Sequence, residues 1–277
     1  MGDRRVLLHH RIDHTGGPHA HRLVLVHGVG DELGGWDRVV QRLPPGFDVL
    51  RYDLRGHGRS QRPPGPYRLE DFVADHLQLV AELGFTPHTL VGFSLGGMIA
   101  QAVALGAPEA VSRLVILSAV AGRTEDERAR VAERLETLRR EGPAGIAAVS
   151  AQRWYTEDFM RREPETVSAR LRRLAANDPD AYLAAYEVLA TNDLLARLPG
   201  IGCPTLIMTG EHDVGSPPRM ALAMHESIAG SELEIVPGIR HELLVEVPDL
   251  VADRIARFAT AAMAVPGGVF SHAEDDA

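Results

Sequence analysis

Short apolar runs recur along the chain and alternate with segments of helical periodicity, and few folds accommodate this alternation. The runs contain no polar residues that would mark an exposed face, which is typical of strands buried on both sides. They lie at residues 23–26, 49–50, 90–91, 114–117, 206–208 and 235–236. Between most of them apolar residues have helical spacing, as at Phe72, Leu79 and Val80, and the same spacing follows the last run at Val251, Ile255 and Phe258. Alternating strands and helices predict a mostly parallel sheet flanked by helices.

The alternation stops between residues 122 and 198, where helix signals follow one another without a buried strand. Thr124 and Glu127 have the spacing of a capping box. Pro164 opens a second helical pattern, and Asp178 precedes the proline that opens a third. The basic and acidic residues of this segment nearly cancel, so we expect solvated helix faces with no binding role as a group.

This interruption predicts the domain organisation. Residues 1–121 and 199–265 form an α/β core, and residues 122–198 form an all-helical insertion. Residues 6–13 predict an antiparallel edge strand, since a Gly-Gly-Pro turn follows them. Residues 266–277 are expected to be a disordered tail.

Composition excludes several classes of function. The 29 basic residues are all arginine, so no lysine is available for Schiff-base, Ser-Lys or P-loop chemistry. The single cysteine, Cys203, excludes a disulfide framework and a cysteine zinc cluster. The net charge of −9 argues against nucleic acid as a partner. No apolar run approaches the 18 residues of a membrane span and no secretion signal opens the chain, so we expect a cytoplasmic protein without a membrane partner.

The sequence Gly-Phe-Ser-Leu-Gly at residues 92–96 carries the strongest functional signal. It follows a predicted strand and precedes a helical stretch, which is the setting that a Gly-x-Ser-x-Gly nucleophile turn requires. The flanking glycines allow a tight, strained turn that exposes the hydroxyl beside a helix N-terminus. Ser94 is therefore the predicted nucleophile, while the alternative is a serine in an ordinary strand-to-helix turn.

A serine nucleophile requires a histidine base and a carboxylate, and in this fold they follow the serine in the order acid, then histidine. Asp213 and His241 each come just after a predicted strand, on the same edge of the sheet as Ser94. We assign Asp213 as the orienting carboxylate and His241 as general base and acid. The competing residues are Glu211 and His212, in the same loop as Asp213, and His225. His212 directly precedes Asp213 and His225 falls inside a predicted helix, so neither histidine suits this chain order.

An oxyanion formed at Ser94 needs two amide donors. The backbone N–H groups of Leu95 and Val29 are predicted to provide them, because the loop after strand 23–26 contains two glycines that can turn the Val29 amide inward. His27 is expected to hold that loop. Arg55 is expected to pair with a buried carboxylate, with contact to an anionic substrate as the alternative.

Two cofactor interpretations have little support. The glycines after strand 23–26 lack the third glycine of a dinucleotide fingerprint, because Leu33 occupies its position. Five histidines at residues 9–21 lack regular spacing and a carboxylate partner for a metal. We expect neither a metal nor an organic cofactor.

These motifs together resemble the α/β-hydrolase superfamily across residues 6–262. Within it the chain is most similar to 3-oxoadipate enol-lactonases and small carboxylesterases, although enol-lactonases often have Asn-Ser where this chain has His27-Gly28. The segments that carry the resemblance are His27-Gly28-Val29-Gly30, Tyr52-Asp53-Leu54-Arg55-Gly56-His57-Gly58-Arg59-Ser60, Gly65-Pro66-Tyr67, Gly92-Phe93-Ser94-Leu95-Gly96-Gly97, Trp154-Tyr155-Thr156, Phe159, Gly210-Glu211-His212-Asp213 and His241.

The resemblance implies that the helical insertion is a cap that follows the sixth strand and covers Ser94. It implies hydrolysis of a small carboxylic ester or lactone through an acyl-enzyme. The alternatives are a carbon–carbon bond hydrolase of a vinylogous diketone, a cofactor-free perhydrolase and a non-catalytic ligand-binding module. Candidates for an apolar substrate pocket are Trp36, Phe93, Met98, Trp154, Tyr155 and Phe159.

Overall fold

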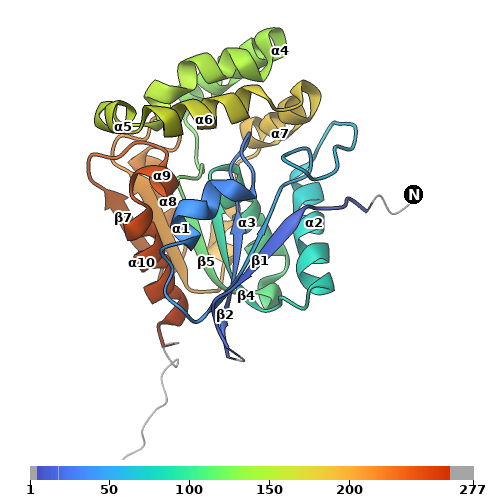
Figure 1. The fold of residues 1–277 in the computed structure, drawn as a ribbon, viewed down its shortest axis with the longest axis vertical. Coiled ribbons are helices and arrows are strands. Elements are labelled where there is room, and N and C mark those ends of the chain that lie inside the picture. The colour runs from blue at the N-terminus through green and yellow to red at the C-terminus, as the bar shows by residue number, and fades with distance from the viewer. Residues whose placement is uncertain (1–4, 18, 263–277) are drawn as a thin grey trace, which may run out of the picture.

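The computed structural model describes residues 5–17 and 19–262, and the predicted tail at residues 266–277 lies outside them. Its centre is a seven-stranded sheet with the strand order β1-β3-β2-β4-β5-β6-β7 (Figure 1). The strands are β1 (His10–His14), β2 (His21–Val26), β3 (Phe47–Tyr52), β4 (His88–Phe93), β5 (Val111–Leu117), β6 (Thr205–Gly210) and β7 (Glu232–Val236). All neighbouring pairs are parallel except β1 with β3. The mostly parallel sheet and its antiparallel edge strand are thereby confirmed, although this strand covers residues 10–14 and not the predicted 6–13.

Helices cover both faces of the sheet, because its strands are apolar on both sides. One face packs against α1 (Asp37–Val40), α9 (Leu243–Glu246) and α10 (Pro248–Thr260). The other packs against α2 (Leu69–Glu82), α3 (Leu95–Gly106) and α8 (Pro218–Ser227), with short 3₁₀ turns at Pro108–Ala110 and Leu195–Gly200, whereas the 3₁₀ turn Leu33–Trp36 buries Trp36 on the face of α1 and α9. The parallel strands β2 to β7 therefore end at one common edge.

Four further helices lie above that edge and form the predicted insertion (Figure 1). They are α4 (Glu125–Trp154), α5 (Glu157–Arg162), α6 (Pro164–Ala175) and α7 (Pro179–Thr191). Thr124 and Glu127 form the expected capping box of α4, and Asp178 caps α7. The insertion follows β5, the fifth strand of the described residues, and not a sixth, because β1 is the single described strand that precedes β2.

The helix α4 is bent within its length. Gly142 has a φ of +67°, which a helix interior does not allow, and Pro143 follows it. The two halves of α4 therefore point in different directions, and Arg134 in the first half reaches Ser150 Oγ in the second at 2.9 Å.

Two clusters of buried polar side chains lie within the core. Arg55 donates two hydrogen bonds of 2.7 Å to Asp75, which is the carboxylate partner expected for this arginine. At the start of β4, Nδ1 of His88 donates to the carbonyl of Phe85. Nε2 of His88 is therefore unprotonated, and it accepts from Nε2 of His76 at 3.2 Å. Both histidines are buried and neutral, and burial lowers their pKa values, to about 4 for His88.

None of the helices in the described residues has the length and apolar character that a bilayer crossing requires.

Candidate active site

Ser94 occupies a strained turn between β4 and α3. Its φ of 54° and ψ of −114° lie in a region that residues with a side chain rarely adopt. The turn is possible because its neighbours are glycines: a Cβ on Gly92 would lie 2.2 Å from the carbonyl oxygen of Gly96, and one on Gly96 would lie 2.2 Å from that of Val26. The structure therefore presents the hydroxyl of Ser94 at the edge where the strands end.

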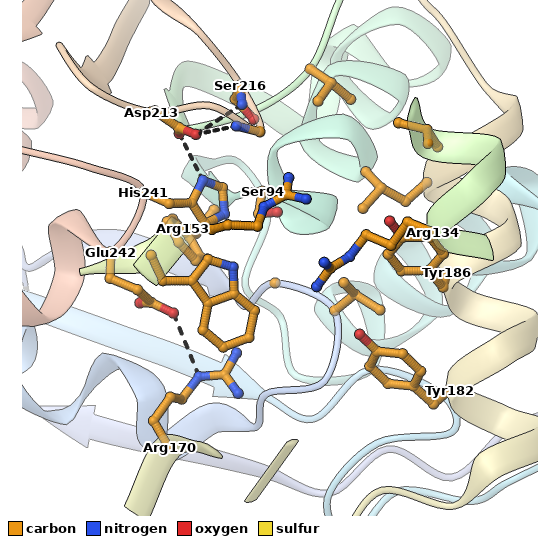
Figure 2. Close-up of a pocket in the computed structure, with 18 of the residues that line it drawn as sticks. Ser94, Arg134, Arg153, Arg170, Tyr182, Tyr186, Asp213, Ser216, His241 and Glu242 are labelled. Atoms are coloured by element: carbon orange, nitrogen blue, oxygen red, sulfur yellow. Dashed lines mark hydrogen bonds and ion pairs between the residues drawn. The ribbon is translucent and has the colours of Figure 1, made fainter. Parts of the chain in front are cut away.

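Asp213 follows β6 and His241 follows β7, and their side chains are in contact. The distance between Asp213 Oδ2 and His241 Nδ1 is 2.7 Å, and Oδ1 accepts from the backbone N–H groups of Gly215 at 2.8 Å and Ser216 at 2.9 Å. Both side chains and Ser94 line one cavity (Figure 2). Within the described chain, Ser94 Oγ has no hydrogen bond to His241, a contact that often tightens only when substrate binds.

The competing residues lie elsewhere. His212 and Glu211 are exposed, and Nδ1 of His225 in α8 bonds with Ser231 at 2.9 Å. None of them lines the cavity that contains Ser94.

Mutual contact determines the charges of the Asp213–His241 pair. Burial tends to raise the pKa of Asp213, but the adjacent imidazole and the two N–H donors outweigh it and hold this pKa below its usual value. Burial tends to lower the pKa of His241, yet the charge and hydrogen bond of Asp213 raise it above 6.5. The proton on Nδ1 therefore faces the carboxylate, and Nε2 is left to accept another proton.

The loop after β2 lies close to Ser94. A Cβ on Gly28 would lie 3.2 Å from Cβ of Ser94, so only glycine fits there without a shift. His27 fixes this loop as expected, because its Nε2 accepts from the N–H of Leu54 at 3.0 Å and its Nδ1 donates to the carbonyl of Gly28 at 2.7 Å. Leu95 is the first residue of α3, where an N–H has no intrahelical acceptor, and in the described loops the N–H of Val29 donates to no residue.

The insertion holds the other side of this loop. Arg170 of α6 and Asn177 donate to the carbonyl oxygen of Gly30 at 3.0 and 3.2 Å. The Arg170 guanidinium also lies 3.4 Å from Asp31 and 3.6 Å from Glu242, the residue after His241. One buried cation of the insertion therefore contacts both the loop after β2 and the loop after β7.

The empty space of this cavity is about 750 Å³ when the open solvent at its mouth is included. Of the six residues predicted to line it, Phe93 and Trp154 do so. Trp36, Met98, Tyr155 and Phe159 do not, and each is at most 2% exposed within an apolar cluster. Met98 points into the layer between α3 and the sheet, and Tyr155 stacks on Phe159 at 5.4 Å between ring centroids. Their apolar character reflects core packing.

The polar lining was not predicted. Arg123, Arg134, Arg153, Arg170, Tyr182, Tyr186, Ser216 and Glu242 all contribute to the cavity wall. The sequence suggested solvated faces for the insertion, because its charges balance in number. The available signal was the burial expected for residues on the same helix face as Leu135 and Leu138, which would have placed Arg134 near the core.

No group of three or more His, Cys, Asp or Glu side chains in the described residues is arranged to hold a metal ion.

The fold and the site together define an α/β hydrolase. Residues 21–248 match the family model for the alpha/beta hydrolase fold. The chain therefore belongs to this family, and it is a hydrolase. Among its relatives, 3-oxoadipate enol-lactonase 2 of Acinetobacter baylyi is 29% identical over 216 residues, which cover 77% of this chain and 79% of that protein. From the same organism, (E)-2-((N-methylformamido)methylene)succinate hydrolase is 29% identical over 233 residues, covering 83% and 86%.

A solved structure gives the same relationship. The enol-lactonase from Burkholderia xenovorans LB400 has a TM-score of 0.84 and 30% identity, covering 93% of this chain and 98% of that one. The resemblance to α/β hydrolases and to enol-lactonases, inferred from the sequence motifs, is therefore confirmed.

Proposed function

We propose that this protein is a serine hydrolase that cleaves a small carboxylic ester or lactone through an acyl-enzyme. Ser94 is the nucleophile, His241 the general base and acid, and Asp213 the orienting carboxylate. The observation that carries the proposal is the 2.7 Å hydrogen bond between Asp213 and His241 on the wall of the cavity that contains the strained Ser94. Relatives named as enol-lactonase and methyl ester esterase support ester or lactone chemistry.

In the first step Ser94 Oγ attacks the carbonyl carbon and transfers its proton to Nε2 of His241. Asp213 stabilises the imidazolium through Nδ1. The carbonyl oxygen becomes an oxyanion, and the N–H groups of Val29 and Leu95 donate to it. The tetrahedral species then collapses, and the leaving alkoxide takes the proton from His241.

In the second step a water molecule transfers a proton to His241 and attacks the acyl carbon. Collapse of that intermediate releases the carboxylic acid and returns the proton to Ser94. The helices α4 to α7 act as a cap in this proposal, because Arg134, Arg153 and Tyr186 of the insertion close the cavity over Ser94.

Covalent labelling tests the nucleophile. A fluorophosphonate probe should add to the wild type and to Ser227→Ala, whose serine in α8 bonds only with the carbonyl of Ala223, but not to Ser94→Ala. Intact mass measures the adduct. Equal labelling of Ser94→Ala would refute the assignment.

The pH dependence tests the base. The pKa of His241 is raised above 6.5 by Asp213, and only the neutral imidazole accepts a proton, so kcat/KM for p-nitrophenyl acetate should fall as the pH drops through that raised pKa. A rate that is flat between pH 8 and pH 5 would contradict a histidine base.

A further inference from the structure

Four arginines line the cavity beside Ser94, and the protein itself satisfies two of them. Arg170 has its ion pairs with Asp31 and Glu242. Arg123 donates to the last carbonyl groups of α7 and the residue that follows it, those of Leu189, Ala190 and Asn192. These two guanidinium groups therefore have partners within the fold.

Arg134 and Arg153, from the two halves of α4, differ from them. Across the described ranges neither forms an ion pair; Arg134 donates a hydrogen bond to Ser150 and also interacts with the hydroxyl of Tyr186, and Arg153 donates none. Figure 2 shows both guanidinium groups directed into the cavity. A Cβ on Gly215, two residues after Asp213, would lie 3.6 Å from Nη2 of Arg153.

Two cations held in one cavity repel each other. The pKa of Arg153 is lowered mainly by burial and secondly by repulsion from Arg134, although a guanidinium stays protonated in proteins. Asp213 attracts Arg153 but does not outweigh burial and repulsion, since it is already bonded to His241 and two N–H groups, and Glu242, the other carboxylate of the cavity wall, is paired with Arg170. Partly desolvated charges without a partner are typical of sites that await a ligand of opposite charge.

We propose that Arg134 and Arg153 form an anion-binding subsite, and that the substrate is an ester or lactone that carries a free carboxylate. This inference rests on the proposed hydrolase function and specifies its substrate class. The scissile carbonyl lies at Ser94 while the carboxylate lies against the guanidinium pair of α4. Guanidinium groups fit a carboxylate because their N–H groups can donate to both oxygens.

The remaining wall favours a short hydrocarbon between the two ends. Val120, Val131 and Leu189 provide apolar surface in the same cavity. A neighbouring cavity shares Arg123, Arg134 and Arg153 with it and adds Glu127 and the exposed Arg130. Glu127 is paired with Arg219, so positive charge extends toward solvent. Such a charged approach raises the local concentration of an anion.

Half-esters measure this preference directly. The probes are the monomethyl esters of succinate, glutarate and adipate, each compared with its primary-amide analogue, which has nearly the same shape and no charge. The quantity is the ratio of kcat/KM for the acid to that for the amide. In the wild type we expect the best acid to exceed its amide roughly tenfold to a hundredfold, as expected for charge-assisted hydrogen bonds.

Arg153→Gln and Arg134→Gln should each reduce that ratio at least tenfold, and Arg153→Lys, which keeps the charge, should retain part of it. The matched control is Arg161→Gln, which removes an exposed arginine of α5 that pairs with Asp158 outside the cavity. Its ratio should equal that of the wild type. A wild-type ratio near one for all three lengths, or the same ratio in Arg153→Gln and Arg161→Gln, would overturn the subsite.

Binding to Ser94→Ala separates this inference from the proposed reaction. Calorimetry with the half-esters and amides reports the charge preference without turnover. Arginine-dependent binding to Ser94→Ala, together with failure of the fluorophosphonate to label the wild type, would support the subsite and refute the serine mechanism. Labelling of Ser94 without a charge preference would support the mechanism and refute the subsite.

Discussion

Replacing Asp213 with asparagine removes a charge and keeps the size of the side chain, and the surrounding hydrogen bonds determine how the new amide is oriented. The N–H groups of Gly215 and Ser216 both point at Oδ1, at 2.8 and 2.9 Å, and Nδ1 of His241 faces Oδ2 at 2.7 Å. Only the carbonyl oxygen of asparagine can accept from the two backbone donors. The NH₂ group of the amide must therefore face His241.

An NH₂ group at that position forces Nδ1 of His241 to become the acceptor, so the imidazole proton moves to Nε2. The nitrogen that faces Ser94 is then protonated and cannot act as the base. By analogy with the Asp-to-Asn change in serine proteases, kcat should fall by about 10⁴, or about 5 kcal/mol of transition-state stabilisation.

The assay is kcat for p-nitrophenyl acetate together with the rate of fluorophosphonate labelling, while a thermal melt reports whether the fold is intact. Glu211→Gln is the matched control, because this exposed carboxylate lies in the same loop and bonds to the N–H of Gly238, not to His241. It should keep its kcat. If Asp213→Asn retained more than a tenth of the wild-type kcat with a normal melt, the tautomer argument would be wrong.

Three further predictions concern stability. Burial lowers the pKa of His88 from 6.5 to about 4, so between pH 7 and pH 5 the unfolded chain binds a proton that the folded chain does not. The free energy of unfolding, measured in urea, should therefore fall by about 2 kcal/mol between these pH values because of His88. Equal stability at pH 7 and pH 5 would contradict this prediction. Gly92→Ala places a Cβ 2.2 Å from the carbonyl oxygen of Gly96, which is a severe clash with the backbone. The variant should therefore be insoluble or melt at least about 10 °C below the wild type. An unchanged melting temperature would contradict the geometry described for this turn. Asp75→Ala removes the carboxylate that accepts two hydrogen bonds from the buried Arg55 and leaves this arginine with the partly exposed Asp71 at 3.6 Å. The variant should lose about 3 kcal/mol in urea unfolding, most of which an apolar replacement of both Arg55 and Asp75 should recover.

The nucleophile turn could be predicted from the sequence because it depends on local backbone geometry. The contacts that exclude a Cβ at Gly92 and Gly96 involve residues of the same turn or the adjacent strand. The two glycines of the Gly-x-Ser-x-Gly motif therefore show directly in the sequence where these contacts occur. Asp213 and His241 are distant in sequence from Ser94, but the topology of a parallel sheet brings all strand ends to one edge. One rule about strand ends therefore sufficed to place them.

The pocket lining could not be predicted in this way, because it depends on how the insertion packs. Trp36 and Met98 are aromatic or long apolar residues near the site in sequence, yet both point into the layers beside the sheet. Residue type indicates that such a side chain is buried but not which side of the backbone it lies on. The fold class and the residues at strand ends can be predicted without knowing the direction of each side chain. The residues that line a pocket cannot be predicted without it.

The bend in α4 explains why the arginine pair was missed. Arg134 and Arg153 are 19 positions apart, and in a straight helix this spacing would separate them by about 28 Å. The positive φ of Gly142 folds the second half back, as the hydrogen bond from Arg134 to Ser150 records, and both guanidinium groups reach one cavity. Charge counting along the sequence treats the two arginines as independent surface residues. Their effect arises only from this bend.

The same insertion also touches the parts of the core that carry the proposed chemistry. Arg170 donates to the carbonyl of Gly30, next to the proposed oxyanion donor Val29, and faces Glu242, next to the proposed base His241. A displacement of α6 would therefore change the position of an amide donor and the field at the base together, and not only the shape of the cavity. For this reason the proposed selection of the substrate and the proposed geometry of the reaction are linked: α4, which carries both Arg134 and Arg153, packs against α6, the helix whose Arg170 contacts the loops around Ser94.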